Sequence, residues 1–95
     1  MPARMLGEAW RLRGSVALRP EPFGALAYDY DTRRLSFLKS ARLVEVVRRL
    51  DGEHTVADAL DQAGVAADER TRYLHALESL AERGMLVTAA VGAGR

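Results

Sequence analysis

Residues 16–40 constrain the fold of this chain more than any other segment. Their sequence, VALRPEPFGALAYDYDTRRLSFLKS, alternates short apolar runs with turns rich in Pro, Asp and Arg. Apolar and polar residues alternate within each run, so we expect strands at about 16–19, 25–30 and 34–38. A sheet of three strands leaves at least one edge open, and an open edge can aggregate or bind an extended peptide.

Helical patterns follow the strands directly. Ser40 stands where an N-cap belongs, and apolar residues recur at helical spacing from 43 to 50. Thr55 and Asp58 have the spacing of a capping box for a shorter second helix, and a third helix is expected over about 68–83. We therefore expect an α+β protein with a winged helix-turn-helix-like fold, in which a three-stranded antiparallel β-sheet is followed by three α-helices.

The chain has 95 residues, which suits a single domain with one modest core. We expect residues 1–9 to be a flexible N-terminal arm, residues 10–88 to form the domain, and residues 89–95 to be a flexible tail. The sequence contains 0 Cys. It also lacks any apolar run near the roughly 20 residues that span a bilayer. We therefore expect a cytoplasmic protein without disulfides or a membrane partner.

Charge is divided unevenly along the chain. Residues 1–50 hold ten basic and five acidic side chains, whereas residues 51–95 hold four basic and eight acidic ones. The simplest interpretation is two solvated faces, but a basic strand region also suits an acidic partner.

Candidate residues for catalysis or metal binding are few. The 2 histidines, His54 and His75, have no second ligand at metal spacing, so we predict no metal site. The pattern contains no Ser-His-acid set and no glycine-rich phosphate loop, and 0 Cys removes thiolate nucleophiles. We therefore expect a binding protein without a cofactor rather than an enzyme.

The candidate binding site is the last predicted strand, residues 34–38. If its edge is open, an extended peptide can add as a further strand, and the last helix would wall the resulting groove. For Leu35 and Phe37 the alternative is packing in the core, and for Phe37 we favour the core over direct contact. Four basic residues would favour an acidic peptide: Arg33, Arg34, Lys39 and Arg42.

Three segments carry a family resemblance. VALRPEPFGAL at 16–26 and RLSFLK at 34–39, together with WRL at 10–12, closely resemble the mycofactocin biosynthesis chaperone family. More broadly, they resemble the precursor-recognition elements of ribosomally synthesised peptide (RiPP) pathways, typified by the pyrroloquinoline quinone biosynthesis (PqqD-like) chaperone. The resemblance covers about residues 10–87, and it is specific in the strand half and mainly one of pattern in the helical half.

The resemblance implies a peptide chaperone with the same winged-helix-like fold. Such a protein binds the leader of a ribosomally made precursor peptide and presents it to a radical SAM enzyme. The expected partners are therefore a precursor leader and a radical SAM maturase, with no nucleic acid, and the chain is expected as a monomer or a domain-swapped dimer. The predicted peptide-binding residues are Arg33, Arg34, Leu35, Ser36, Phe37, Leu38, Lys39, Arg70, Tyr73, Leu74 and Leu77.

Two other functions stay open at this point. A winged-helix DNA-binding transcriptional regulator would need a basic recognition helix, yet the last helix balances Arg70, Arg72 and Arg83 with four acids. A small structural or toxin–antitoxin-type interaction protein also fits the size of the chain. Nucleic-acid binding that falls steeply with salt would favour the regulator.

Overall fold

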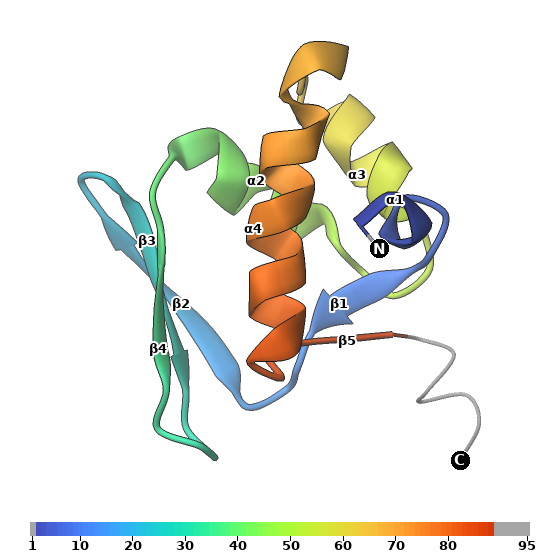
Figure 1. Ribbon diagram of the computed structural model, residues 1–95. Coiled ribbons are helices and arrows are strands. Elements are labelled where there is room, and N and C mark those ends of the chain that lie inside the picture. The colour runs from blue at the N-terminus through green and yellow to red at the C-terminus, as the bar shows by residue number, and fades with distance from the viewer. Residues whose placement is uncertain (1, 89–95) are drawn as a thin grey trace.

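The computed structural model describes residues 2–88 of the chain. Strands β2 (Val16–Glu21), β3 (Gly24–Asp29) and β4 (Leu35–Leu38) form an antiparallel sheet in the order β2-β3-β4 (Figure 1). The predicted three-stranded antiparallel sheet is confirmed. β2 continues through Pro20, beyond its predicted end at 19, because a proline is tolerated on an edge strand.

Three helices follow the sheet, as the sequence predicts. α2 spans Ala41–Arg49 and α3 spans Val56–Gln62. A single 3-10 turn, η1 (Ala67–Glu69), leads into α4 (Arg70–Glu82), so the last α-helix begins two residues later than expected. The α+β prediction is thus confirmed in element type and order.

Both predicted N-caps are in place. The Ser40 hydroxyl oxygen accepts a hydrogen bond from the Leu43 N–H at 3.0 Å. The Thr55 hydroxyl oxygen accepts one from the Asp58 N–H at 3.1 Å. Each bond satisfies an amide that the first turn of a helix leaves unpaired.

A two-stranded ribbon joins the two ends of the domain. β1 (Trp10–Leu12) pairs antiparallel with β5 (Leu86–Thr88). The Arg13 N–H also donates to the Met85 carbonyl at 2.9 Å, which brings the start of the sheet and the end of α4 together.

The first residues pack against the domain, although the sequence predicts a flexible arm over 1–9. Residues Pro2–Met5 form α1, and Met5 is 5% exposed within the core. The carbonyls of Leu6 and Glu8 accept hydrogen bonds from the first N–H groups of α3, both at 3.0 Å. These contacts bury apolar surface and satisfy amides at a helix N-terminus, whereas the flexibility of residues 1–9 stays a prediction. The predicted tail at 89–95 lies outside the described residues.

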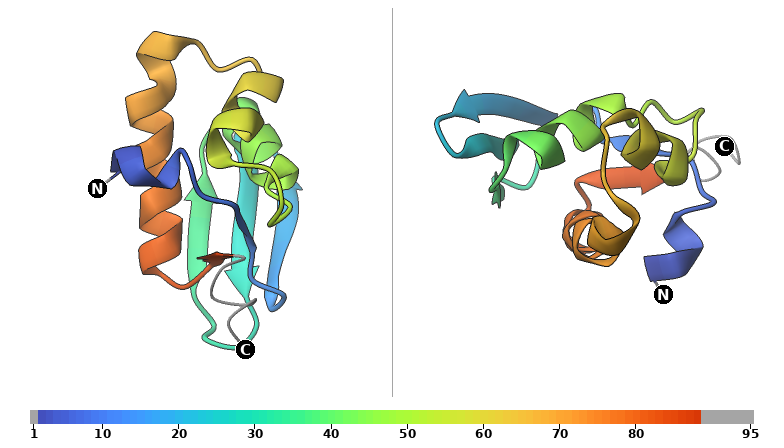
Figure 2. Two further views of the ribbon diagram at one scale, coloured as in Figure 1. Left: turned by 90° about the vertical axis from the view of Figure 1, so that its right-hand side faces the viewer. Right: turned by 90° about the horizontal axis from the view of Figure 1, so that it is seen from above.

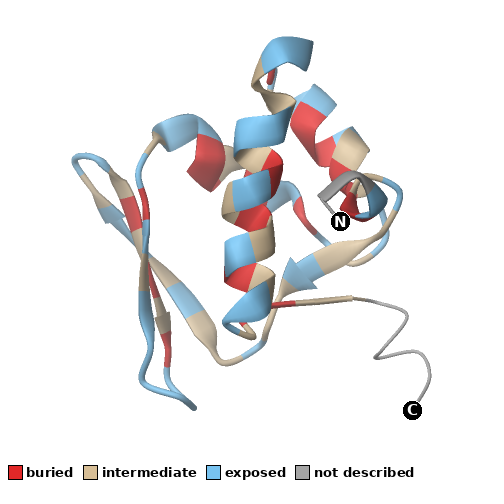
Figure 3. Ribbon diagram, in the orientation of Figure 1, coloured by how far each residue is buried: buried red, intermediate tan, exposed pale blue. Residues whose placement is uncertain are grey.

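All helices lie on one side of the three-stranded sheet (Figures 1 and 2). On this inner face Ala25, Ala27 and Asp29 of β3 are all 0% exposed, and α2 packs over β3 and β4. Buried and intermediate residues alternate along β3 (Figure 3), as expected for a strand with one face on the core. Within residues 2–88 no helix or strand covers the opposite, outer face. None of the helices in that range is long and apolar enough to cross a membrane.

Candidate functional site: an open strand edge beside a basic groove

The register of the sheet decides which backbone groups of β4 are available. The Asp29 N–H donates to the Arg34 carbonyl at 2.9 Å, and the same register pairs Ala27 with Ser36. Hydrogen-bonded and non-hydrogen-bonded pairs alternate along an antiparallel ladder. The N–H and C=O groups of Ser36 therefore point to β3, inside the sheet.

The backbone groups of Leu35 and Phe37 point the other way, to the open edge of β4. No other strand in residues 2–88 pairs with this edge. The Leu35 carbonyl does have one contact, because the guanidinium of Arg83, which directly follows α4, donates to it at 3.4 Å. The edge thus offers the donors and acceptors that an added strand would use.

The opposite edge of the sheet, on β2, is interrupted by a proline. The Tyr30 N–H donates to the Ser15 carbonyl at 2.9 Å, so the odd-numbered residues of β2 face β3 and the even-numbered residues face the edge. Pro20 is one of these even-numbered residues and has no N–H to donate. β4 contains no proline, which makes its edge the better template for a peptide.

A groove runs between β4 and α4, and we call it the β4–α4 groove. It consists of two hollows of about 300 and 340 Å³ that share Lys39, Leu43 and Ala76. The whole of β4 lines one wall, and Ser40 lies at the end nearest α2. The opposite wall is formed by five side chains of α4 and by Arg83, the residue that follows the helix: Arg72, Tyr73, Ala76, Ser79, Leu80 and Arg83.

The groove is electropositive. Lys39, Arg72 and Arg83 line it, and no Asp or Glu is among the described residues of its lining. Arg72 pairs with Glu69 at 3.3 Å, but both side chains are well exposed, and such a pair is weak. The groove therefore suits a ligand with carboxylates better than a basic ligand.

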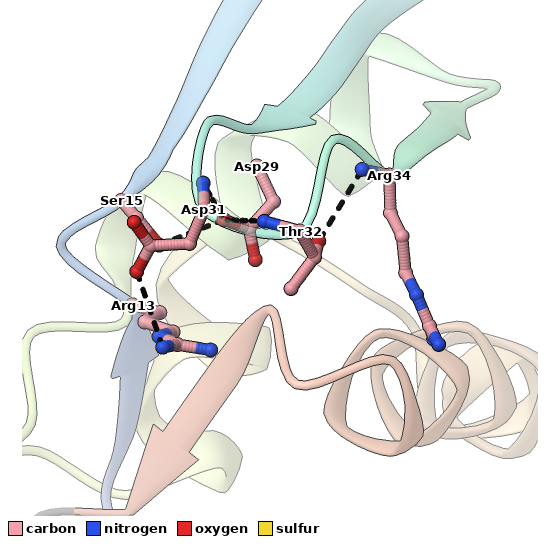
Figure 4. Close-up of polar contacts among 6 residues, drawn as sticks. All are labelled: Arg13, Ser15, Asp29, Asp31, Thr32 and Arg34. Carbon is pink, nitrogen blue, oxygen red and sulfur yellow. Dashed lines mark hydrogen bonds and ion pairs between the residues drawn. The ribbon is translucent and has the colours of Figure 1, made fainter.

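The loop that leads into β4 is organised by Asp29 (Figure 4). Its Oδ1 accepts hydrogen bonds from the Ser15 hydroxyl at 2.8 Å and the Asp31 N–H at 2.9 Å. Burial by itself raises the pKa of the Asp29 carboxyl, but these hydrogen bonds and those from Thr32 outweigh it and hold the pKa below its usual value. The side chain of Arg34 extends away from this cluster.

The four basic residues predicted around the strand have different surroundings. Arg33 and Arg34 are exposed, and like Lys39 they form no ion pair within residues 2–88. Arg42 instead donates to two carbonyls just past the end of α3, at 3.1 and 2.7 Å. Its role in the structure is therefore to hold α3 to α2.

The structure brings together some of the predicted α4 residues and not others. Tyr73 lines the groove. Leu74 and Leu77 are 5% and 0% exposed and belong to the core, and neither is among the residues that line the groove. Arg70 forms an ion pair with Asp61 of α3. Direct contact of the peptide with Leu74, Leu77 or Arg70 stays a prediction. The position of these side chains outside the groove lining does not favour it.

Leu35 and Phe37 lie on the uncovered outer face of the sheet. Phe37 is 59% exposed, so the expectation that it packs in the core is wrong. The reason is the strand period, since the inward positions of β4 are Ser36 and Leu38. The Phe37 ring instead meets the Phe23 ring edge to face, with centroids 5.9 Å apart.

Sequence reasoning missed the groove face of α4. Arg72, Ala76, Ser79 and Arg83 follow one another at helical spacing and share that face. This spacing is visible in the sequence, but the neighbouring stripe of large apolar residues is stronger. That stripe predicts the core face of the helix, and the predicted site residues Leu74 and Leu77 belong to it.

The described residues contain no cluster of three or more His, Cys, Asp or Glu side chains placed to hold a metal ion. The chemistry of the site is therefore that of backbone pairing, apolar contact and positive charge.

Comparison with known proteins identifies the family. A sequence profile of the peptide chaperone MftB family matches residues 9–87, a segment that includes the entire β4–α4 groove. The chain belongs to the peptide chaperone MftB family. The resemblance that the strand segments carry is thereby confirmed.

Three relatives agree with this assignment. The peptide chaperone MftB of Mycolicibacterium smegmatis is 53% identical over 79 residues, which cover 83% of this chain and 78% of that protein. Those of Mycobacterium ulcerans and Mycobacterium tuberculosis are 53% and 49% identical over 78 residues, covering 82% of this chain and 72% of each relative. No solved structure is significantly similar to the chain.

Proposed function

We propose that the protein binds the leader of the mycofactocin precursor, a ribosomally synthesised peptide, as an added strand on β4, and presents it to a radical SAM maturase. The observation that carries this proposal is the open edge of β4, which borders a groove lined by cations. Membership in a peptide chaperone family supports a peptide as the ligand.

Backbone pairing alone would bind such a peptide weakly. Leu35 and Phe37 together offer two N–H donors and two C=O acceptors at the edge. At about 1 kcal/mol net per hydrogen bond, four bonds contribute about 4 kcal/mol, so even before the cost of association the Kd would be no tighter than about 1 mM. A chaperone that binds more tightly needs side-chain contacts as well, and the groove can supply them.

Charge gives the groove a preference for an acidic leader. Lys39 and Arg72 lie at the end of the groove near α2, and Arg83 lies near Leu35. The long bond from Arg83 to the Leu35 carbonyl would be replaced by a bond from the added strand. The freed guanidinium can then pair with a leader carboxylate.

The proposal makes the protein a non-catalytic adaptor that acts in the cytoplasm, as a monomer or a domain-swapped dimer. Incubating it alone with the precursor should leave the peptide mass unchanged, as measured by mass spectrometry. A mass change without any enzyme present would contradict this part of the proposal. Size-exclusion chromatography with light scattering decides the oligomeric state.

The strand addition itself is tested by amide hydrogen exchange, resolved by residue with NMR. On adding the leader, protection should rise at the Leu35 and Phe37 amides, because these point to the open edge. The Ser36 amide, already bonded to β3, should change little. Protection that appears at α3 instead, with the Leu35 and Phe37 amides unchanged, would rule out addition at this edge.

A DNA-binding role has less support from the geometry. Arg70 pairs with Asp61 of α3, and Arg72 and Arg83 are balanced in charge by Glu78 and Glu82, so α4 has no excess of positive charge for a phosphate backbone. Salt-sensitive binding to duplex DNA, together with no binding of the leader, would favour that role instead.

A further inference from the structure

Two rows of side chains cross the outer face of the sheet and end at the open edge of β4. In one row Leu26 of β3 stands beside Phe37, and in the other Tyr28 stands beside Leu35. Phe37 is 59% exposed and Leu35 is 48% exposed. Each row therefore ends at β4 in an apolar side chain, and no strand within residues 2–88 lies beyond it.

The same two residues also direct their backbone groups to the open edge. A strand added there would place one residue directly opposite Leu35 and one opposite Phe37, with their side chains on the outer face. Exposed apolar residues on an open edge favour aggregation, and proteins usually replace them with Lys or Pro, as β2 does with Pro20. Their presence on β4 points to a neighbour that covers them.

We propose that the bound leader strand is apolar on both of its faces. Its residues opposite Leu35 and Phe37 carry apolar side chains on the outer face, while the residue between them enters the β4–α4 groove beside Leu80. The ligand is thus an extended segment with at least three consecutive apolar residues and with acidic residues at its ends. This inference rests on the proposed strand addition and specifies the peptide that it accepts.

Charge favours such a peptide over a second copy of this chain. Antiparallel pairing of two β4 strands would bring Arg33 or Arg34 of one copy close to Lys39 of the other, and like charges across a strand pair are destabilising. The same three cations have no ion pair within residues 2–88. Acidic residues that flank an apolar segment would pair with them.

The first arm of the test is a threonine scan of a synthetic leader peptide from the mycofactocin precursor. Threonine keeps the strand propensity but removes most of the apolar side chain. Affinity for the wild-type protein is measured by fluorescence anisotropy. If only the groove face of the leader contacts the protein, threonine should lower the affinity at every second residue. If both faces contact it, threonine should lower the affinity at three or more consecutive residues.

The second arm changes the protein. Leu35→Thr and Phe37→Thr should each weaken leader binding by about tenfold, because each removes an apolar cross-strand contact at the edge. Ala17→Thr is the control, since Ala17 is exposed on β2 at the far side of the sheet from the open edge, and the leader affinity of this variant should be unchanged. All three sites are exposed, so circular dichroism should show wild-type folding.

Substitutions in the leader and in the protein should also have non-additive effects where the two residues are in contact. The leader positions that face Phe37 should lose little further affinity in Phe37→Thr, because the contact is already absent. Two results together would overturn the inference: a loss of affinity at alternate leader residues only, and unchanged leader affinity in Leu35→Thr and Phe37→Thr. The partner that covers the outer face would then be a different protein. Strand addition would survive that result. A leader that fails to bind, or that binds without protecting the Leu35 and Phe37 amides, would remove the proposed function as well.

Discussion

Proline substitution along β4 tests the backbone geometry of the site directly. Phe37→Pro removes an N–H that points to the open edge, whereas Ser36→Pro removes one that is bonded to β3. Phe37→Ala and Ser36→Ala are the matched controls, because they remove the same side chains and keep the amides. Phe37→Pro should therefore weaken leader binding without lowering stability, whereas Ser36→Pro should lower the stability of the fold.

The expected magnitudes follow from the surroundings of each amide. In Phe37→Pro a leader carbonyl is left without its donor, which costs about 1–3 kcal/mol of binding, or roughly 5- to 150-fold in Kd relative to Phe37→Ala. In Ser36→Pro the carbonyl of Ala27, a residue that is 0% exposed, loses its partner within the sheet. A loss of about 2 kcal/mol would lower the Tm by about 10 °C relative to Ser36→Ala.

The assays are thermal melting by circular dichroism and fluorescence anisotropy with a labelled leader peptide. Phe37→Pro should melt close to Phe37→Ala and bind more weakly, and Ser36→Pro should melt lower. If Ser36→Pro kept the Tm of its control and lost leader binding, while Phe37→Pro bound as tightly as Phe37→Ala, the assigned direction of the edge amides would be wrong.

Three further predictions concern charge, the N-terminal segment and pH. Reversing Arg33 and Arg34 together to Glu should weaken leader binding by about 1–2 kcal/mol, mostly through the association rate, and equal binding in this variant and in the control Arg48→Glu would show that the charge is only solvating. Met5→Ala should cost about 2–3 kcal/mol of unfolding free energy, measured by urea denaturation, whereas a flexible arm would leave it unchanged. Because hydrogen bonds lower the pKa of Asp29 in the folded state, its contribution to stability is present above the ordinary aspartate value near about 4 and is lost as pH falls below it. The Tm of Asp29→Asn should therefore fall less than that of the wild type between about pH 6 and pH 3, and equal losses would refute this role.

The sequence alone was sufficient for the type and order of the main elements. The alternation of apolar residues in 16–38 and the helical stripes after Ser40 are local patterns, and local patterns determine strands, helices and caps. The family resemblance could also be recognised from short segments, because the sequences of residues 16–26 and 34–39 are distinctive in themselves.

Only the tertiary structure decided which face of each strand and helix packs in the core and which face stays exposed. Phe37 and Leu38 are equally apolar in the sequence, yet one is exposed and the other is 2% exposed, because only the position of the helices makes one sheet face the core. The same holds for α4, where the more apolar stripe packs inward and Arg72, Ala76, Ser79 and Arg83 are left for the groove. Periodicity defines faces within an element, but it does not say what each face meets, since that depends on contacts between residues far apart in the chain.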